Sequence, residues 1–321
     1  MTATRYPKFD VHAHVEGPKA AYVEAADAFG IHAALNMSYS GFREPDGLAA
    51  YEFALQEDMR RYPKRFRYCT SFSITHFDEP GYADGVIAKL GRDVDDAGAV
   101  AVKIWKDLGM MLQDGGGRYV FCDDPRFAPV FDFIAAQGLV LVAHLADPRA
   151  AWLPLDPDSP HYGYYSRHPE FHWYGRTGVP SHDEILEHRA ALLSRYPGLR
   201  MVACHLASLE HDVRDVAAFL DAFPNAAVDV AGRWADLMRQ DDDVVHEFFR
   251  TYQDRILFGT DWEVDASTFS ADPAQRASQI AARRRPFAAM YRYFEEQLDL
   301  PEETLRKFYW QNAADRFGLG S

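Results

Sequence analysis

The stretch Phe9-Asp10-Val11-His12-Ala13-His14 alternates apolar and polar residues, which is the pattern of a half-buried β-strand. Side chains alternate between the two faces of a strand, so we expect His12 and His14 to share a face with Asp10 and the apolar residues to share the other. Neutral imidazole nitrogens are common metal ligands, but a His-x-His pair also occurs on solvated edge strands. The motif alone leaves a metal-bearing strand and an exposed edge as alternatives.

The composition is that of an acidic globular protein. Of its 321 residues 48% are hydrophobic and 26% charged, and the formal net charge is -14. Such a chain can bury a large core, and it lacks the basic excess that a nucleic-acid partner would require. The three separated cysteines, Cys69, Cys122 and Cys204, predict buried reduced thiols, because their spacing supports neither a disulfide framework nor a cysteine metal site.

The same survey bounds the location and the partners of the chain. No apolar run reaches the roughly 18 residues of a membrane span, and the first residues lack a signal-peptide pattern. We therefore expect a cytoplasmic protein that acts on a small molecule and binds neither a membrane nor nucleic acid. The sequence leaves a homo-oligomer open.

Short apolar runs alternate with longer stretches of helical spacing along the whole chain. After the opening strand, we expect strands at 31–37, 66–74, 100–105, 139–145, 201–206, 226–230 and 255–262. We expect helices at 20–29, 48–62, 85–97, 125–137, 185–196, 210–223, 244–252, 273–298 and 302–310. Eight strands with intervening helices and no linker predict an α/β fold in which residues 1–321 form a single (β/α)8 TIM barrel with C-terminal helices.

The stretch 146–180, which follows the predicted fifth strand, has no clear periodicity. It is rich in aromatic residues and contains Arg167 and Arg176. Long loops inside a compact domain are usually lids or binding loops, so we expect a lid or substrate loop here. A surface flap or an interface is the alternative.

Metal-compatible residues fall near the ends of several predicted strands. In a TIM barrel the carboxyl ends of the strands form one mouth, where the active site lies. The residues that would converge there are His12, His14, Lys103, His144, His205 and Asp261. Imidazoles with a carboxylate suit a zinc-like ion, so this convergence favours a metal-bearing strand over an exposed edge at the first strand.

The chain resembles the amidohydrolase superfamily, within the branch that contains aminocarboxymuconate semialdehyde decarboxylase. The resemblance covers nearly the whole chain and rests on five stretches: 9–14, Val142-Ala143-His144, Ala203-Cys204-His205-Leu206-Ala207, Ile256-Leu257-Phe258-Gly259-Thr260-Asp261 and Asn312-Ala313-Ala314-Asp315-Arg316-Phe317-Gly318. It implies one divalent metal, usually zinc, with manganese, iron and cobalt as alternatives. The implied ligands are His12, His14, His144 and Asp261.

The resemblance also implies roles for the neighbouring residues. His205 would position or deprotonate the metal's water, and His205 and Asp261 would move protons. Lys103 would lie near a single-metal site if it points inward, where it could bridge metals or contact a substrate anion, and would be structural if it points outward. Separately from the resemblance, the position of Asp10 on the face of the histidines and one step deeper predicts that it orients a histidine or nearby polar groups rather than binding metal.

Because the superfamily is mostly hydrolytic, the resemblance implies hydrolysis of an ester, lactone or amide carbonyl in a small, optionally carboxylated, organic substrate by an activated water; the candidate ligands themselves do not separate this from decarboxylation. A metal-dependent decarboxylase of an aromatic or enoic acid is the alternative, and a catalytically inactive binding barrel is the second. The candidate substrate contacts, which include arginines suited to a carboxylate, are Lys103, Trp105, Arg167, Arg176, Arg233 and Trp262.

Overall fold

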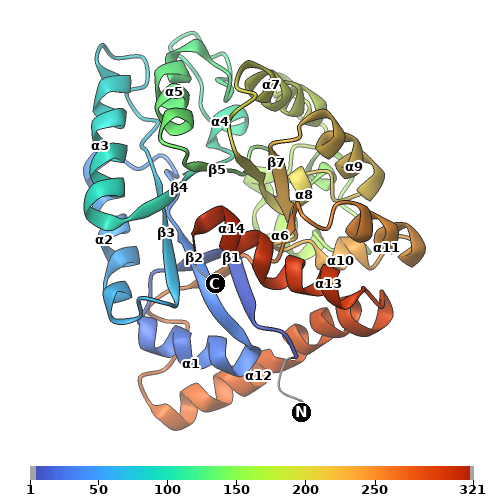
Figure 1. Ribbon diagram of the computed structural model, residues 1–321. Helices are drawn as coiled ribbons and strands as arrows, with labels where there is room; N and C mark the ends of the chain where they lie inside the picture. The colour runs from blue at the N-terminus through green and yellow to red at the C-terminus, as the bar shows by residue number, and fades with distance from the viewer. Residues whose placement is uncertain (1–4, 319–321) are drawn as a thin grey trace.

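The computed structural model describes residues 5–318 as a curled, all-parallel sheet of nine strands surrounded by helices (Figure 1). The order in the sheet is β8-β7-β6-β5-β4-β3-β2-β1-β9. The strands are β1 Lys8–Val15, β2 Ile31–Met37, β3 Phe66–Ser71, β4 Ala99–Ile104, β5 Val140–Ala143, β6 Met201–Ala203, β7 Ala226–Asp229, β8 Ile256–Leu257 and β9 Trp262–Val264. Strands β1 to β8 pair in parallel with their neighbours in sequence, and β9 pairs in parallel with β1, which confirms a TIM-barrel-like α/β fold.

Helices cover the outer face of the sheet. The α-helices are α1 Lys19–Phe29, α2 Pro45–Gln56, α3 Tyr82–Ala97, α4 Asp107–Met110, α5 Ala128–Ala136, α6 Tyr162–Arg167, α7 His182–Arg195, α8 Cys204–Ala207, α9 Val213–Ala222, α10 Trp234–Leu237, α11 Asp242–Thr251, α12 Pro273–Arg292, α13 Glu302–Arg306 and α14 Asn312–Phe317. Short 3-10 segments are η1 Met59–Arg61, η2 Pro125–Phe127, η3 Arg149–Trp152 and η4 Pro169–Phe171, and π-helical turns are η5 Tyr293–Gln297 and η6 Lys307–Gln311. The predicted C-terminal helices are present, each ending in a π-helical turn.

The hydrophobic core has an inner and an outer part. The outer part joins the sheet to the helices. The inner part takes side chains from β1 to β8 and fills the barrel; among its members are Phe9, Val11, Leu35, Cys69, Ala101, Val140, Val142, Val202, Cys204, Ala227 and Leu257. A curled sheet buried on both faces explains why its strands read as nearly continuous apolar runs.

Strand β1 departs from the alternation that its sequence predicts. Phe9 and Val11 belong to the inner core, whereas Ala13 belongs to the outer core. The pairing register with β2 shifts between Asp10 and Ala13. Such an irregularity re-aims side chains, so that the consecutive residues Val11 and His12 both face the barrel interior. The expectation that Asp10 shares a face with the two histidines is therefore wrong.

The predicted strand at 255–262 is two short strands. Strand β8 pairs with β7, and β9 pairs with β1. The residues between them still bond to β1: Val11 N–H donates to the Phe258 carbonyl at 2.9 Å, and Asp261 N–H donates to the His12 carbonyl at 2.8 Å. Asp261 has a φ of 61°, which interrupts the strand.

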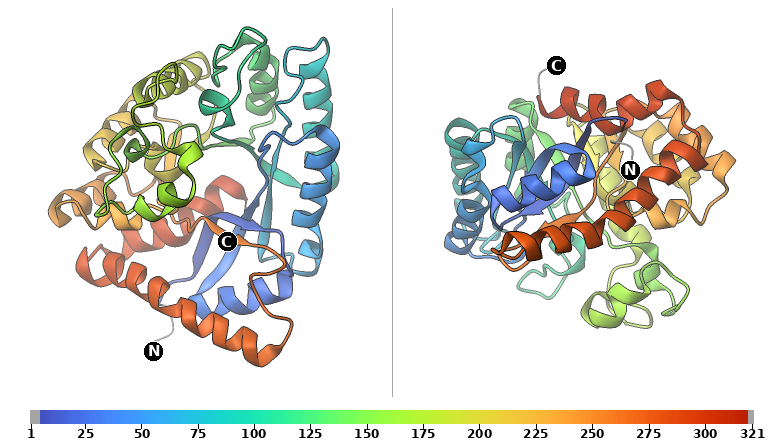
Figure 2. Two further views of the ribbon diagram at one scale, coloured as in Figure 1. Left: turned by 180° about the vertical axis from the view of Figure 1, so that it is seen from behind. Right: turned by 90° about the horizontal axis from the view of Figure 1, so that it is seen from below.

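The two ends of the barrel are covered by different elements. Helix α14 lies across the end where the strands begin, and its Phe317 packs against Phe9 with ring centroids 6.2 Å apart. The segment 146–180 lies on the opposite side, as the two views of Figure 2 show. It contains η3, α6 and η4, so the stretch without sequence periodicity is irregular backbone interrupted by three short helical turns.

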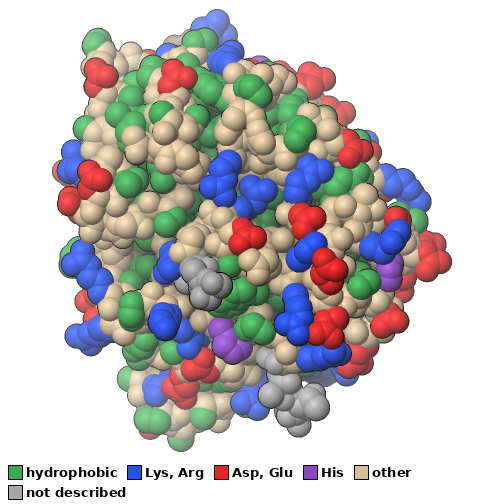
Figure 3. Space-filling view, in the orientation of Figure 1, with side chains coloured by type: hydrophobic (Ala, Val, Ile, Leu, Met, Phe, Trp, Pro, Cys, Tyr) green, Lys and Arg blue, Asp and Glu red, His purple; other side chains and the backbone are tan. Residues whose placement is uncertain are grey.

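The surface shows no segregation of charge on the face of Figure 1. There, Lys and Arg side chains are interspersed with Asp and Glu side chains (Figure 3). No helix within residues 5–318 is both long and apolar enough to span a bilayer. The three cysteines are buried and unpaired, as predicted.

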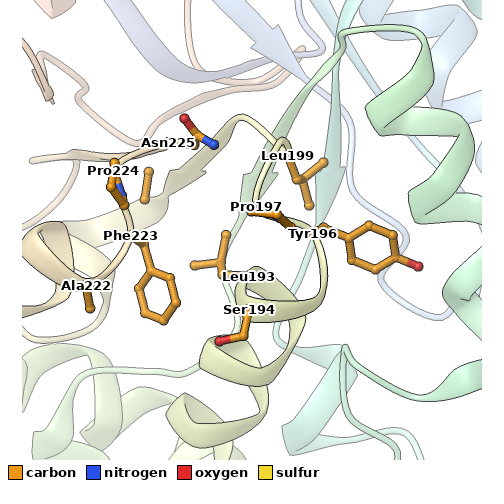
Figure 4. A pocket seen from close by; sticks show the side chains of 10 residues that line it. Leu193, Ser194, Tyr196, Pro197, Leu199, Ala222, Phe223, Pro224 and Asn225 are labelled. Atoms are coloured by element: carbon orange, nitrogen blue, oxygen red, sulfur yellow. The ribbon is translucent and has the colours of Figure 1, made fainter.

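A cavity of about 330 Å³ opens near the start of β6 and β7. Figure 4 shows it between the end of α7, with Leu193 and Tyr196, and the end of α9, with Phe223. None of the candidate site residues lines it. The cavity lies where strands begin, whereas the candidate residues lie where strands end.

Candidate metal centre

Three of the four predicted metal ligands form one compact group. Donor atoms of His12, His14 and Asp261 all lie within 4.8 Å of one another. The Asp261 Oδ1 atom is 3.2 Å from His12 Nε2 and 3.8 Å from His14 Nε2. His12 is buried, while the Asp261 side chain keeps 37% of its exposure. The group therefore has buried imidazoles on one side and an opening at the carboxylate.

Hydrogen bonds to the far ring nitrogens aim these imidazoles at Asp261. His14 Nδ1 lies 2.9 Å from the Met37 carbonyl, and His12 Nδ1 lies 3.0 Å from Asp229 Oδ2. Each contact favours a proton on Nδ1, which leaves Nε2 as a lone-pair donor to an ion. Burial, and then the neighbouring His12, lowers the pKa of His14 to about 3, so this ligand is neutral at pH 7.

His144 and His205 extend the group deeper along the mouth. The His205 ring lies 4.7 Å from the His12 ring and 4.3 Å from the His144 ring, centroid to centroid. The buried Nε2 of His144 has no hydrogen-bond partner among the described residues. An unpartnered buried nitrogen is costly unless a ligand satisfies it, so His144 fits a metal-binding role although it lies outside the compact group.

His205 is held in a defined orientation. Its Nδ1 lies 2.7 Å from the Ala231 carbonyl, and its backbone N–H donates to Asp229 Oδ1 at 2.7 Å. Burial, followed by the nearby His144, lowers the pKa of His205 well below its usual value. The ring is thus neutral, with its proton on Nδ1 and a free lone pair on Nε2.

The turn that carries His205 has an unusual backbone. His205, Leu206, Ala207 and Ser208 have φ values of 59°, 54°, 59° and 57°. Each L-residue in this left-handed conformation costs about 1–2 kcal/mol, and such residues rarely occur in runs. The surrounding structure must therefore impose this turn.

Lys103 points into the barrel. It is 1% exposed, and its Nζ lies 3.1 Å from Cys204 Sγ and 3.4 Å from His12 Nε2. These contacts place Lys103 beside the compact group, as the inward alternative predicts. Cys204, His12 and Asp229 also have donor atoms within 4.8 Å of one another, on the inner side of His12.

Asp229 supports both histidines and was missed in the sequence. It accepts hydrogen bonds from His12 and from the His205 backbone. Burial acts to raise its pKa, but the adjacent His12 and these hydrogen bonds outweigh burial and lower the pKa to about 2. Asp229 ends β7, so the rule of strand ends that selected the histidines could have found it.

Asp10 organises backbone next to the ligands rather than their rings. Its Oδ1 accepts from the N–H groups of His12 and Thr260, and its Oδ2 accepts from Thr260 Oγ1 at 2.6 Å. It thus ties β1 to the residue that precedes Asp261. Burial raises the pKa of Asp10 to about 7, against the lowering effect of these hydrogen bonds.

A buried ion pair that the sequence did not reveal lies at the mouth. Lys106 Nζ is 2.8 Å from Asp147 Oδ1, and that oxygen is 3.5 Å from His144 Nε2. Tyr164 and Phe171 of the 146–180 segment contact the Lys106 ammonium, which lies 3.7 Å from the Phe171 ring centroid. These contacts join the segment to the candidate centre. Lys106 follows β4 by two residues, but its sequence position carried no signal of an ion pair.

The predicted substrate contacts occupy different places. The positive charge of Arg233 contributes to the lowered pKa values of His144 and His205, and Asp261 in turn raises the pKa of Arg233. The Nε atom of Arg233 is buried without a partner among the described residues. Trp105 lies beside Phe171 at the mouth, with ring centroids 6.4 Å apart. Arg233 and Trp105 thus border the candidate centre.

The other predicted contacts lie further out. Arg167 is exposed on α6, and the exposed Arg176 donates to the Pro169 carbonyl within its own segment. Trp262 packs against Tyr22 and Phe29 of α1, at 5.3 and 5.6 Å between ring centroids. Trp262 therefore packs between the sheet and the helices, and its contact with substrate stays a prediction.

Comparison with known proteins places this geometry in context. The sequence model of the amidohydrolase family matches residues 9–319. A search of curated proteins gave no significant match. A 2,6-dihydroxybenzoate decarboxylase complexed with 2,6-dihydroxybenzoate has a similar structure, with a TM-score of 0.61, 17% identity and coverage of 97% of this chain and 99% of the other.

Two further solved structures are similar over the same shares of the chains, 97% and 99%. One, described as an amidohydrolase from Staphylococcus aureus, has a TM-score of 0.59 and 13% identity. The other, an amidohydrolase II, has a TM-score of 0.54 and 15% identity. At these identities the likeness establishes the fold alone.

Proposed function

Because the chain belongs to the amidohydrolase family, we propose that it is a metal-dependent hydrolase that uses an activated water to cleave an ester, lactone or amide of a small organic substrate. One observation carries the proposal: the compact group of His12, His14 and Asp261 lies beside a neutral, oriented His205. Oriented ligands with an open side are what a catalytic metal site requires.

The proposal includes one domain with a closed (β/α)8 barrel. In this view β8 and β9 are one eighth strand, interrupted at the residue that binds metal. The bonds from Val11 to Phe258 and from Asp261 to His12 support closure, because they continue the ladder across the interruption. The interruption lets Asp261 turn towards His12 and His14.

The residues fit a single divalent ion, for which zinc is our first expectation. His12, His14, His144 and Asp261 would hold it, and the unpartnered Nε2 of His144 is a position that an ion would satisfy. A bound ion would supply Lewis-acid chemistry, polarising a carbonyl and acidifying water. Lys103 remains a neighbour on the inner side of His12 in this arrangement.

His205 and Asp261 are the groups placed to move a proton. The His205 proton on Nδ1 is engaged with Ala231, so Nε2 can accept a proton from the attacking water and return it to the leaving group. Asp261 is the second acceptor, because its Oδ1 lies 3.2 Å from His12 Nε2 and its side chain is 37% exposed at the mouth.

Arg233 is the residue we assign to a substrate carboxylate. Its buried Nε has no partner, and a guanidinium can bind a carboxylate through two parallel hydrogen bonds. The 146–180 segment would cover the bound substrate, since Tyr164 and Phe171 already contact Lys106 at the mouth. Exclusion of water by these aromatic residues would strengthen the charge interactions within the site.

Two measurements test the proposal. Elemental analysis of the purified protein, before and after addition of zinc or manganese, should find one ion per chain. The metal-loaded protein should then cleave members of a panel of lactones, esters and amides. Release of carbon dioxide from aromatic or enoic acids without any such cleavage would establish the decarboxylase alternative instead. A protein that binds no added metal would overturn both and leave the inactive barrel.

Variants separate the ligands from the proton-transfer group. His144→Ala should lose the metal, whereas His205→Ala should keep the metal and lose turnover. His246→Ala is the matched control, because His246 is a partly buried histidine on α11 whose Nδ1 bonds to the Leu298 carbonyl. Full metal content and activity in both site variants would show that the site is assigned wrongly.

A further inference from the structure

The contacts of the candidate metal centre do not explain the left-handed backbone of residues 205–208. His205 and Asp229 fix only its first residue, through the His205 N–H. Leu206 and Ala207 then continue with φ values of 54° and 59°, although neither is glycine. A backbone strained over several residues persists only when its surroundings hold it.

Arg189 of α7 makes the contact best placed to hold the turn. Its Nη1 donates to the Ala207 carbonyl at 2.5 Å, and its guanidinium lies 4.4 Å from the centre of the Phe219 ring. Arg189 is only 4% exposed, and no carboxylate of the described chain lies within ion-pair distance of it. A charged group buried without an acid is costly, so its contact with the carbonyl is a specific structural feature.

Two further contacts fix the end of the turn. His182 Nε2 lies 2.9 Å from the Ser208 carbonyl, and Ser208 Oγ donates to the Ala146 carbonyl at 2.5 Å. The second contact links the turn to Ala146, which follows His144 by two positions and the end of β5 by three. Successive carbonyls of the strained turn, those of Ala207 and Ser208, are thus both engaged by side chains of α7.

We propose that Arg189 is a positioning residue for His205: by binding the Ala207 carbonyl it holds the left-handed turn and so fixes the direction of the His205 ring. The role of His205 in turnover rests on the function proposed above. The role of Arg189 in stabilising the turn is independent of that function. Arg189 itself touches neither the compact group nor the mouth.

The first test measures the turn directly. Arg189→Met should raise hydrogen exchange of the Ser208 and Leu209 amides, which donate to the His205 and Leu206 carbonyls. Arg255→Met is the matched control, because Arg255 also donates to carbonyls, those of Leu220 and Phe223, and packs near the Tyr252 ring. The control should leave exchange at 204–209 unchanged. Unchanged exchange in folded Arg189→Met would overturn the proposal.

The second test asks whether relief of strain makes Arg189 dispensable. Glycine adopts positive φ without the penalty of a side chain, so Ala207→Gly should hold the turn with less help. The unfolding midpoint and the exchange of Ser208 should then change less when Arg189→Met is made in the Ala207→Gly background than in the parent. Fully additive effects would assign Arg189 a general packing role and refute the proposal.

The third test uses activity. Arg189→Met should lower kcat by about tenfold or more with KM within about twofold, because a small misplacement of a reacting group is expensive. Arg189→Lys, which keeps a donor, should restore part of kcat. An unchanged kcat in Arg189→Met would contradict the link to His205. If no substrate is found, the proposed function fails, whereas the hydrogen-exchange measurement and the double variant with Ala207→Gly still test the role of Arg189.

Discussion

The two ends of the barrel interior differ in chemistry and in backbone regularity. At the end where strands begin, Phe9 and Leu257 pack with Phe317 of α14 in a continuous apolar core. At the opposite end, His12 and Lys103 are buried in contact with each other. The first end gains stability from burial, whereas the second must satisfy buried polar atoms one by one.

Three backbone irregularities lie at the polar end, and β1 has a further register shift between Lys8 and Phe9 at the apolar end. The register shift of β1 precedes His12, the interrupted strand contains Asp261, and the left-handed turn carries His205. Each of these departures lies at or next to a residue of the candidate centre, where it sets the direction of that side chain. Burial at the apolar end therefore offsets the free-energy cost of the irregular backbone at the polar end.

The largest expected effect is at the apolar end. Phe9→Ala should lower the free energy of unfolding by about 3–5 kcal/mol, because it opens a cavity between β1 and α14. Denaturant unfolding measures the loss, and Phe53→Ala, at a side chain that is 71% exposed, is the control with little effect. Metal content per folded molecule should stay unchanged; loss of metal from the folded variant would show that the two ends are not separable.

The sequence predicted the regular part of this comparison well. Eight apolar runs at barrel spacing gave the strands, and the rule of strand ends gave His12, His14, His205 and Asp261, because both depend on periodicity that a single sequence displays. Which side chains of β1 point into the barrel could not be predicted in this way. A register shift depends on pairing with β2 and on the bonds between Asp10 and Thr260, which are contacts between residues distant in sequence.

The supporting residues were missed for a related reason. Arg189 binds the carbonyl of Ala207, in the loop after β6, and Lys106 forms an ion pair with Asp147. No local sequence pattern indicates either contact. Asp229 was within reach, since it ends β7 as the histidines end their strands.

The second expected effect tests how closely the polar end is packed. A Cβ atom added at Gly259 would lie 3.1 Å from His12 Cβ and 3.1 Å from Ala231 Cβ. Gly259→Ala should therefore cost about 1–3 kcal/mol of unfolding free energy and weaken metal binding by moving His12. Gly85→Ala is the control: α3 leaves open space there, and alanine should stabilise the helix by about 0.5–1 kcal/mol. Unweakened metal binding in Gly259→Ala would mean that His12 tolerates displacement.

The third expected effect concerns the support of His12. Asp229→Asn keeps the size of the side chain but removes the charge that faces His12 Nδ1. Metal affinity should fall by about 10–100-fold, as for other partners of metal-binding histidines, and titration with a chelator measures it. Asp236→Asn is the matched control, because Asp236 pairs with His161 at 2.9 Å outside the compact group. Equal losses in the two variants would argue for a general electrostatic effect.

The smallest expected effect lies on the surface of the polar end, where His76 contacts Glu44 and Glu79 at 2.8 Å each. The hydrogen bonds that the His76 ring donates to Glu44 and Glu79 raise the pKa of His76 above its usual 6.5. A raised pKa means that the folded state binds the proton more tightly, so the stabilisation is complete below pH 6.5 and is lost as pH rises through the folded pKa. Unfolding midpoints of His76→Gln and the parent should therefore differ at pH 5.5 and converge at pH 9.

Because His76 is exposed, the difference should shrink in about 1 M salt, where the screening length is about 3 Å. A difference that persists at pH 9 would assign it to the left-handed backbone of His76, whose φ is 62°, rather than to charge.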